Sequence, residues 1–141
     1  MNGELKSVCI KNKHDGNIMN IKQADLIKTG IPNDVHCDGG DKQISILPYE
    51  LIEEYEKENG GGKVEYGKYG ENLAVQGIDY KSLKVGDDFS IGDARLLVTQ
   101  IGAEYATKEN TSCKNKIHKN YIFCKVLVPG IITVGDQVNI D

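Results

Sequence analysis

Short apolar runs that alternate with polar positions dominate the chain and predict β-strands. The first run covers residues 5 to 12 and places Val8 and Ile10 on one face. A weaker strand follows at Ile18 and Ile21, after the turn sequence HDGN. Further strands are predicted by the segments QISILP, NLAVQG, DFSIG, ARLLVTQIG and YIFCKVLVPG. Glycine turns separate the later segments, so the second half of the chain is expected to be β-structure.

One segment, PYELIEEYEKEN at residues 48 to 59, has the spacing of a helix. Leu51, Ile52 and Tyr55 cluster on one side, and Pro48 suits the first helical position. The glycine run that follows predicts the end of the helix. The glutamates are expected to face water: Glu53, Glu54, Glu56 and Glu58.

One element recurs, because KVGDDFSI at 84 to 91 matches TVGDQVNI at 133 to 140. Glycine permits a positive φ, and the aspartate can bond the backbone of its own turn. We interpret both as structural turns that lead into strands at the rim of a barrel. The fold class predicted is mostly β and barrel-like, with one or two helices, as a single domain over residues 1–141.

Composition limits the function. The hydrophobic fraction of 39% and the charged fraction of 27% suit a globular protein. The net charge of −4 argues against bulk nucleic-acid binding, although a few lysines could still hold a small anion. Because neither a membrane-length apolar run nor an apolar N-terminal block is present, no membrane association and a cytoplasmic location are expected.

The loop GIPNDVHCDGGDKQ, residues 30 to 43, concentrates polar and reactive groups. Gly39 and Gly40 would let backbone N–H groups approach an anion, Lys42 would add a charge, and His36 could donate or accept a hydrogen bond. The alternative is a polar turn held in shape by Asx turns, which composition alone favours. Its aspartates are Asp34, Asp38 and Asp41.

A second candidate, YGKYGENLAVQGID at residues 66 to 79, places Glu71 and Asn72 directly before a strand. This pair could bond the polar edge of a ligand. Alternatively, Asn72 could cap a turn and pin two loops together, which is the interpretation we favour from these residues alone.

The cysteines provide a third candidate. Cys9 and Cys124 alternate with apolar neighbours and are expected to be packed. Cys37 and Cys113 lie in polar stretches and are the candidates for chemistry. Lysines and His118 near Cys113 could lower its pKa, but an inert loop cysteine is an equal alternative. The spacing does not fit a structural zinc site.

Four segments in order, GIPNDVHCDGGDKQISIL, YGENLAVQGID, LKVGDDFSIGDARLLVTQIG and VPGIITVGDQV, together resemble the MOSC domain. That domain forms the C-terminus of the molybdenum cofactor sulfurase and has stand-alone bacterial relatives. The resemblance covers nearly the whole chain. It implies a β-barrel-like fold and a role with the molybdenum cofactor (molybdopterin), as a presumed sulfur carrier. Pyridoxal phosphate is not expected here, because the sulfurase binds it in a separate domain.

The resemblance also implies site residues. Two segments would line the cofactor cleft. The first contributes His36, Gly39, Gly40, Asp41, Lys42 and Gln43, and the second contributes Gly70, Glu71 and Asn72. Lys42 stands where relatives often have arginine. Lysine keeps the positive charge but lacks the planar guanidinium group that can bind a phosphate through two parallel hydrogen bonds.

One departure from the family pattern affects the chemistry. Many relatives place a cysteine shortly after the VTQIG strand, and here GAEYA puts Tyr105 at that position. Either Cys113, or less favourably Cys37, has taken over as the catalytic thiol, with Cys113 as the candidate molybdenum ligand, or the chain binds without catalysing. Whether it is an enzyme therefore stays open. The alternatives are a non-catalytic cofactor carrier and the cofactor-bearing part of a reductase for N-hydroxylated compounds. The partners implied are a cysteine desulfurase, a molybdoenzyme or an electron donor.

Overall fold

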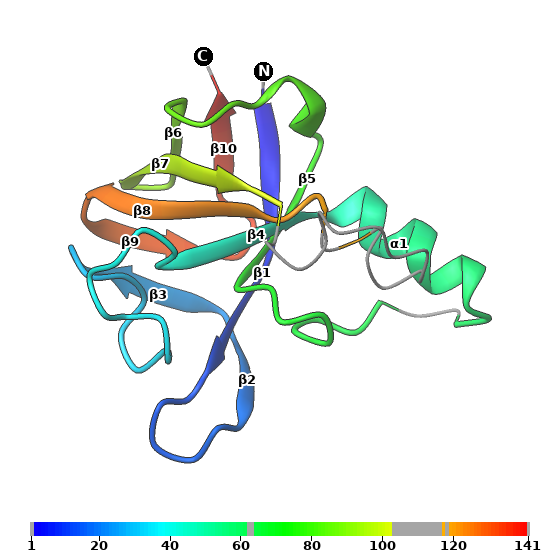
Figure 1. Cartoon of the computed structure of the whole chain (residues 1–141), viewed down its shortest axis with the longest axis horizontal. Coiled ribbons are helices and arrows are strands. Elements are labelled where there is room, and N and C mark those ends of the chain that lie inside the picture. Colours follow the sequence, from blue (N-terminus) through cyan, green and yellow to red (C-terminus); the bar gives the residue numbers. More distant parts are fainter. Residues whose placement is uncertain (1, 62–63, 103–116, 118, 141) are drawn as a thin grey trace.

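The computed structural model describes residues 2–61, 64–102, 117 and 119–140. Figure 1 shows a β-barrel with one helix projecting from its side and the two chain ends close together. In chain order the elements are β1 (Asn2–Lys11), β2 (Ile18–Ile21), β3 (Gln23–Leu26), β4 (Ile44–Pro48), α1 (Tyr49–Glu58), β5 (Leu73–Gln76), the 3₁₀ turn η1 (Tyr80–Ser82), β6 (Asp88–Ile91), β7 (Ala94–Ile101), β8 (Ile122–Val128), β9 (Gly130–Thr133) and β10 (Gln137–Ile140).

Seven strands close the barrel in the order β10-β6-β7-β8-β4-β5-β1. Closure occurs where β1 pairs with β10, with Gly3 opposite Val138. Strand β2 extends the sheet beyond β1, and β3 pairs with β9 as a separate ribbon. Closure removes the open edges of the barrel sheet, which otherwise invite association. The prediction of a mostly β, barrel-like fold with one or two helices is confirmed.

The alternating pattern explains which side chains fill the barrel. In β7, Ala94, Leu96 and Val98 are buried while the residues between them are partly exposed. Opposite them, β8 buries alternate positions, including the predicted packed Cys124. A second apolar cluster lies outside the barrel under α1 and includes Ile52. Cys9 is also buried, as predicted.

The recurring Val-Gly-Asp turns have the predicted backbone geometry. Gly86 and Gly135 have φ values of +97° and +99°. The Asp87 carboxylate accepts a bond from the Lys84 backbone N–H (2.8 Å), and Asp136 accepts the equivalent bond from Thr133 (2.7 Å). The two strands that follow, β6 and β10, are neighbours in the barrel. The repeat is therefore a structural device that starts two adjacent strands.

Helix α1 departs from its prediction in two places. Pro48 has extended backbone (ψ 129°) and precedes the helix as its N-cap, because it ends strand β4. Glu56 is buried (5% exposed) and does not face water. Its carboxylate accepts hydrogen bonds from the Tyr69 hydroxyl and the Lys68 ammonium group. These partners come from the loop before β5, which the helical pattern does not reveal.

Strands β3 and β9 are a further difference, since the sequence pattern does not predict them. Each is four residues long, and β9 follows Pro129 directly. Short ribbons of this kind depend on their partner more than on alternation. No helix in the described part of the chain has the length and apolar character needed to cross a lipid bilayer.

Candidate functional site

The parallel pairing of β4 with β5 positions the candidate site. Ile46 lies opposite Leu73 and Leu47 opposite Ala74, so both strands run in one direction. The loops that precede them must therefore reach the same end of the barrel. Strand β1 runs antiparallel to β5, which brings its last residues to that end too. We call this end, where residues 30–43 meet residues 64–72, the mouth.

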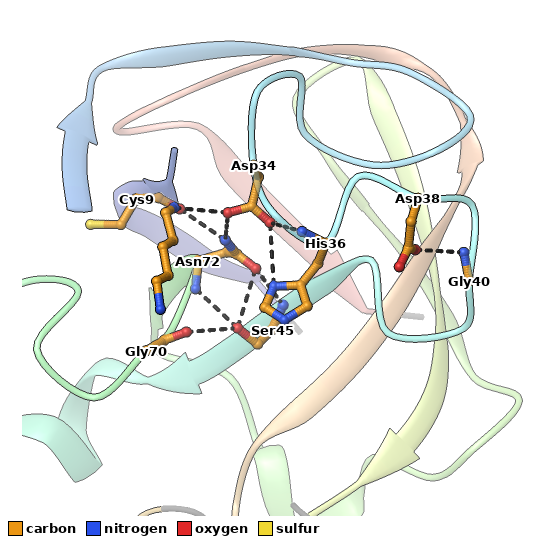
Figure 2. Close-up of polar contacts among 9 residues, drawn as sticks. Cys9, Asp34, His36, Asp38, Gly40, Ser45, Gly70 and Asn72 are labelled. Carbon is orange, nitrogen blue, oxygen red and sulfur yellow. Dashed lines mark hydrogen bonds and ion pairs between the residues drawn. The ribbon is translucent and has the colours of Figure 1, made fainter. Parts of the chain in front are cut away.

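Asp34 is the centre of the mouth (Figure 2). Its side chain is fully buried, yet it accepts hydrogen bonds from the backbone N–H groups of Lys11 (2.9 Å, to Oδ1) and His36 (3.0 Å, to Oδ2). The Asn72 amide donates to Oδ1 at 3.2 Å, and His36 Nδ1 lies 3.5 Å from Oδ2. One carboxylate thus joins three parts of the chain: β1, the loop at residues 30–43 (the 30s loop) and the residue before β5.

Asn72 uses its whole side-chain amide within the protein. Its Oδ1 accepts from the backbone N–H and the hydroxyl of Ser45 (2.9 and 3.2 Å). Its Nδ2 donates to the Cys9 carbonyl (3.0 Å) and to Asp34. Two donated and two accepted bonds are the usual capacity of an amide. Asn72 therefore pins the loops together, which is the interpretation that the sequence favoured. A ligand in the mouth would have to bind other groups.

The charges at the mouth are coupled. Burial works to raise the pKa of Asp34, but the interaction with His36 and the backbone N–H bonds outweigh it, so the pKa lies below its usual value. The Asp34 side chain in turn raises the pKa of His36, with burial only partly opposing it. The pair therefore favours a carboxylate beside a protonated imidazole.

Two adjacent hollows open at the mouth. The first hollow, about 200 Å³, is lined by Cys9, Ile10, Lys11, Ile18, Asp34, His36, Gly67, Gly70, Glu71 and Asn72. The second hollow, about 260 Å³, is lined by His36, Lys42, Ser45, Tyr69, Gly70, Asn72, Tyr121 and Phe123. His36, Gly70 and Asn72 belong to both, so they form the wall between them.

The second hollow combines cationic and aromatic groups. Lys42 Nζ lies 5.5 Å from the centre of the Phe123 ring, within cation–π range. Tyr69 and Tyr121 add two further rings, and the Tyr121–Phe123 centroids are 5.5 Å apart. Burial and the bond to Glu56 raise the pKa of Tyr69 far above its usual value, so its phenol stays protonated. This combination suits a flat, negatively charged guest.

The first hollow holds two buried acids and one thiol. Glu71 is 2% exposed, and its carboxylate accepts from the backbone N–H groups of Gly67 (2.7 Å) and Tyr69 (3.2 Å). Burial raises the pKa of Glu71, while these bonds oppose the shift. Burial first, and Glu71 second, raise the pKa of the Cys9 thiol to about 11. Cys9 is therefore protonated near neutral pH and a poor nucleophile.

The Gly39–Gly40 turn serves the loop itself. The Gly40 N–H donates to the Asp38 carboxylate (2.9 Å), and the Gly39 N–H donates to the Thr29 carbonyl (3.3 Å). Figure 2 shows the Asp38–Gly40 bond well apart from the Asp34 network. The Asx turns predicted at Asp34 and Asp38 are present, and neither glycine lines the two hollows.

The other predicted residues of this loop also lie outside the hollows. Gln43 is buried and its Oε1 accepts the backbone N–H of Val126 (2.9 Å), which ties the loop to β8. The Asp41 carbonyl accepts a bond from the Thr99 hydroxyl. Cys37 is half-buried, with its sulfur 3.3 Å from the Thr29 hydroxyl. Three predicted features, Tyr105, Cys113 and His118, lie outside the described residues.

Of the predicted residues, the structure brings His36, Lys42, Gly70, Glu71 and Asn72 to the hollows. Sequence reasoning missed the central position of Asp34, which it assigned only to a local turn. It also missed Ser45 and the aromatic wall of Tyr69, Tyr121 and Phe123. The proximity of Asp34 to an Asn 38 residues later has no sequence signal, because the parallel β4–β5 pair creates it.

The fold and the mouth define a small β-barrel domain with a ligand-sized cleft at one end, lined by charged, polar, apolar and aromatic side chains. Its sequence matches the family model described as the MOSC domain over residues 32–139. The chain belongs to the MOSC domain family, which is linked to molybdenum cofactor binding or sulfur transfer. A search of curated protein sequences finds no match.

Solved structures share the fold. The YuaD protein from Bacillus subtilis is similar with a TM-score of 0.75 and 21% identity, over 98% of this chain and 94% of that chain. YiiM from Geobacillus stearothermophilus has a TM-score of 0.69 and 18% identity, over 99% of this chain and 75% of that one. YiiM from Escherichia coli has a TM-score of 0.65 and 17% identity, over 98% and 69%. At these identities the similarity shows the fold alone.

Proposed function

We propose that this chain binds a molybdopterin-like cofactor across the two hollows of the mouth. The single observation that carries the proposal is the convergence of His36 and Lys42 with three aromatic rings around the second hollow. A pterin offers a flat ring that can stack on aromatic side chains, and its phosphate is an anion that lysine and protonated histidine attract. The family's link to this cofactor supports the same ligand class.

The residues fit the organic part of the cofactor. Lys42 and His36 would hold the phosphate, with the Lys11 ammonium group at the rim of the first hollow as a further cation. Tyr69, Tyr121 and Phe123 would face the ring. When bound, the cofactor would supply redox or sulfur chemistry at its molybdenum.

The residues fit the metal less well. Among the described residues, no group of three or more His, Cys, Asp and Glu side chains could hold a metal ion. The one thiol among the residues lining the two hollows, Cys9, is protonated near neutral pH and therefore a poor ligand. Cys113 stays our candidate for the molybdenum ligand or sulfur-bearing thiol, and Cys37 is the weaker candidate for the catalytic thiol only.

Direct titration tests cofactor binding. Apo-protein would be mixed with molybdopterin released from a molybdoenzyme, and binding followed by equilibrium dialysis under anaerobic conditions. We expect Lys42→Ala to weaken binding about tenfold, the loss of one charge-assisted contact. Lys84→Ala, at an exposed lysine that lines neither hollow, is the matched control and should bind like wild type. Failure of wild type to bind would end the proposal.

A cofactor carrier, which binds the cofactor without transferring sulfur, is the second candidate. The one thiol among the residues lining the two hollows, Cys9, is protonated near neutral pH and would not accept sulfur readily. Incubation with a cysteine desulfurase and free cysteine, followed by mass spectrometry, distinguishes the two roles. A sulfur carrier would gain one persulfide, which we expect Cys113→Ala to abolish; loss of the persulfide in Cys37→Ala instead would assign the role to the weaker candidate. A chain that stays unmodified while binding molybdopterin would be a carrier. In both roles we propose a cytoplasmic location with a desulfurase or a molybdoenzyme as partner.

A further inference from the structure

His36 occupies a special place in the mouth, because it is part of the wall between the two hollows. Its side chain is 57% exposed, while the Asp34 side chain behind it is fully buried. The backbone N–H of His36 bonds Asp34 Oδ2 at 3.0 Å, and the ring Nδ1 lies 3.5 Å from the same atom. The ring is thus held on one side by a fixed carboxylate. Its other nitrogen, Nε2, bonds no residue in the part of the chain that the structure describes.

Asp34 cannot easily move away from His36. Its Oδ1 is held by the Lys11 backbone N–H and by Asn72, and its Oδ2 accepts the backbone N–H of His36 itself. If the carboxylate moved away, these buried donors would lose their hydrogen-bond partner, which would cost about 1–3 kcal/mol of stability for each donor. The carboxylate is therefore a permanent negative neighbour of the imidazole.

Several other groups set the charge around the ring. Asp38 adds negative potential and Lys11 adds positive potential at His36. The remaining ionisable groups that face it across the hollows are Cys9, Lys42, Tyr69, Glu71 and Tyr121. Of these, Cys9 and Tyr69 are uncharged near neutral pH, because burial raises the pKa of each. Lys42 remains as the positive group that shares the second hollow with His36.

We propose that His36 is a proton-linked clamp, so that an anion entering the hollows is bound together with a proton on the His36 ring. Asp34 acts as the positioning residue that holds Nδ1, which leaves the Nε2 side of the ring for the guest. This proposal rests on the proposed function, in that the guest is an anion at the same mouth. It adds that ligand capture depends on pH and that one named side chain carries the dependence.

The sign of the effect follows from linkage. An anion binds the protonated imidazole better than the neutral ring, so binding raises the affinity of the ring for its proton, and the reverse is equally true. Affinity is therefore highest below the pKa of His36 in the free protein. It falls as pH rises through that value, by at most about tenfold per pH unit for one proton. Because Asp34 raises the pKa of His36, the fall is expected closer to neutral pH than for an ordinary histidine.

The experiment uses a probe whose own charge is constant. Naphthalenesulfonate combines a flat ring with a sulfonate that stays ionised across the whole range. Calorimetric titrations of the full chain between about pH 5.5 and 8.5, in buffers of different ionisation enthalpy, measure affinity and proton uptake together. We expect wild type to lose about tenfold or more in affinity over this range and to take up a fraction of a proton per probe bound. His36→Asn should bind with an affinity that changes less than about twofold with pH.

The matched control is His14→Asn, at an exposed histidine of the β1–β2 turn that lines neither hollow. It should keep the wild-type pH profile. A wild-type affinity that does not change with pH, or a profile that survives in His36→Asn, would overturn the clamp while leaving cofactor binding intact. Absence of probe and molybdopterin binding at every pH would overturn the proposed function and the clamp with it.

The positioning role of Asp34 needs its own readout. Asp34→Asn removes the charge but keeps a polar group of the same size, and Asp38→Asn is its exposed counterpart in the same loop. We expect Asp34→Asn to move the midpoint of the profile to lower pH by more than Asp38→Asn does. If Asp34→Asn does not fold, NMR titration of the His36 ring in wild type, with and without the probe, decides the question. The probe must raise the pH midpoint of that ring, and an unchanged midpoint would overturn the proposal.

Discussion

At the scale of single residues, the mouth depends on polar side chains that are buried and fully bonded. Asp34 and Asn72 are each less than 5% exposed, and both hold backbone groups from distant parts of the chain. Burying such groups is favourable only when each donor and acceptor finds a partner. Their first role is therefore to fix the positions of His36 and the Gly70 turn. The ligand-facing groups are then left at the surface.

This role predicts a large stability effect at Asn72. Asn72→Ala leaves the Ser45 N–H and the Cys9 carbonyl without their partners inside the protein. We expect the free energy of unfolding, measured with urea, to fall by about 2–4 kcal/mol. Asn20→Ala, at an exposed asparagine of β2, is the control and should change it by less than about 0.5 kcal/mol. Equal effects of the two substitutions would contradict the pinning role.

The side-chain partners of Asn72 and Glu56 could not be predicted from the sequence. Asn72 could be recognised as a pin or a ligand group, because an amide before a strand suits both, but its partner Asp34 could not be identified. Glu56 was assigned to water because helical spacing describes only the helix. Its burial results from Tyr69 and Lys68, which reach it from another loop. Side-chain partners far apart in sequence are set by the tertiary fold.

At the scale of elements, the strands of the barrel were largely predictable. Short apolar runs mark β7 and β8 in the sequence without any knowledge of their partner strands, and buried and more exposed positions alternate along most of each strand. The two Val-Gly-Asp turns were predictable for the same reason, since their geometry needs only local residues. Strands β3 and β9 were not, because each is stabilised by pairing with the other, and the two strands lie far apart in the sequence. The parallel β4–β5 pair, which creates the mouth, follows from topology and not from any local pattern.

At the scale of the whole molecule, the barrel acts as a rigid frame that brings three segments together at one end. The 30s loop, the turn before β5 and the end of β1 meet there, and two hollows open between them. The other end carries the termini and the loop with η1, and it stands opposite the mouth in Figure 1. Binding residues on loops held by a fixed scaffold are a common arrangement. The central claim is that an anionic guest binds at the mouth and nowhere else on the frame.

Backbone amide chemical-shift mapping tests this claim most directly. Isotope-labelled protein would be titrated with molybdopterin, and shift changes followed at every assigned amide. We predict that the largest changes fall within residues 34–45 and 67–72, with the turns at Gly86 and Gly135 unchanged as internal controls. Largest changes at those turns or along α1, with the mouth unaffected, would contradict the account.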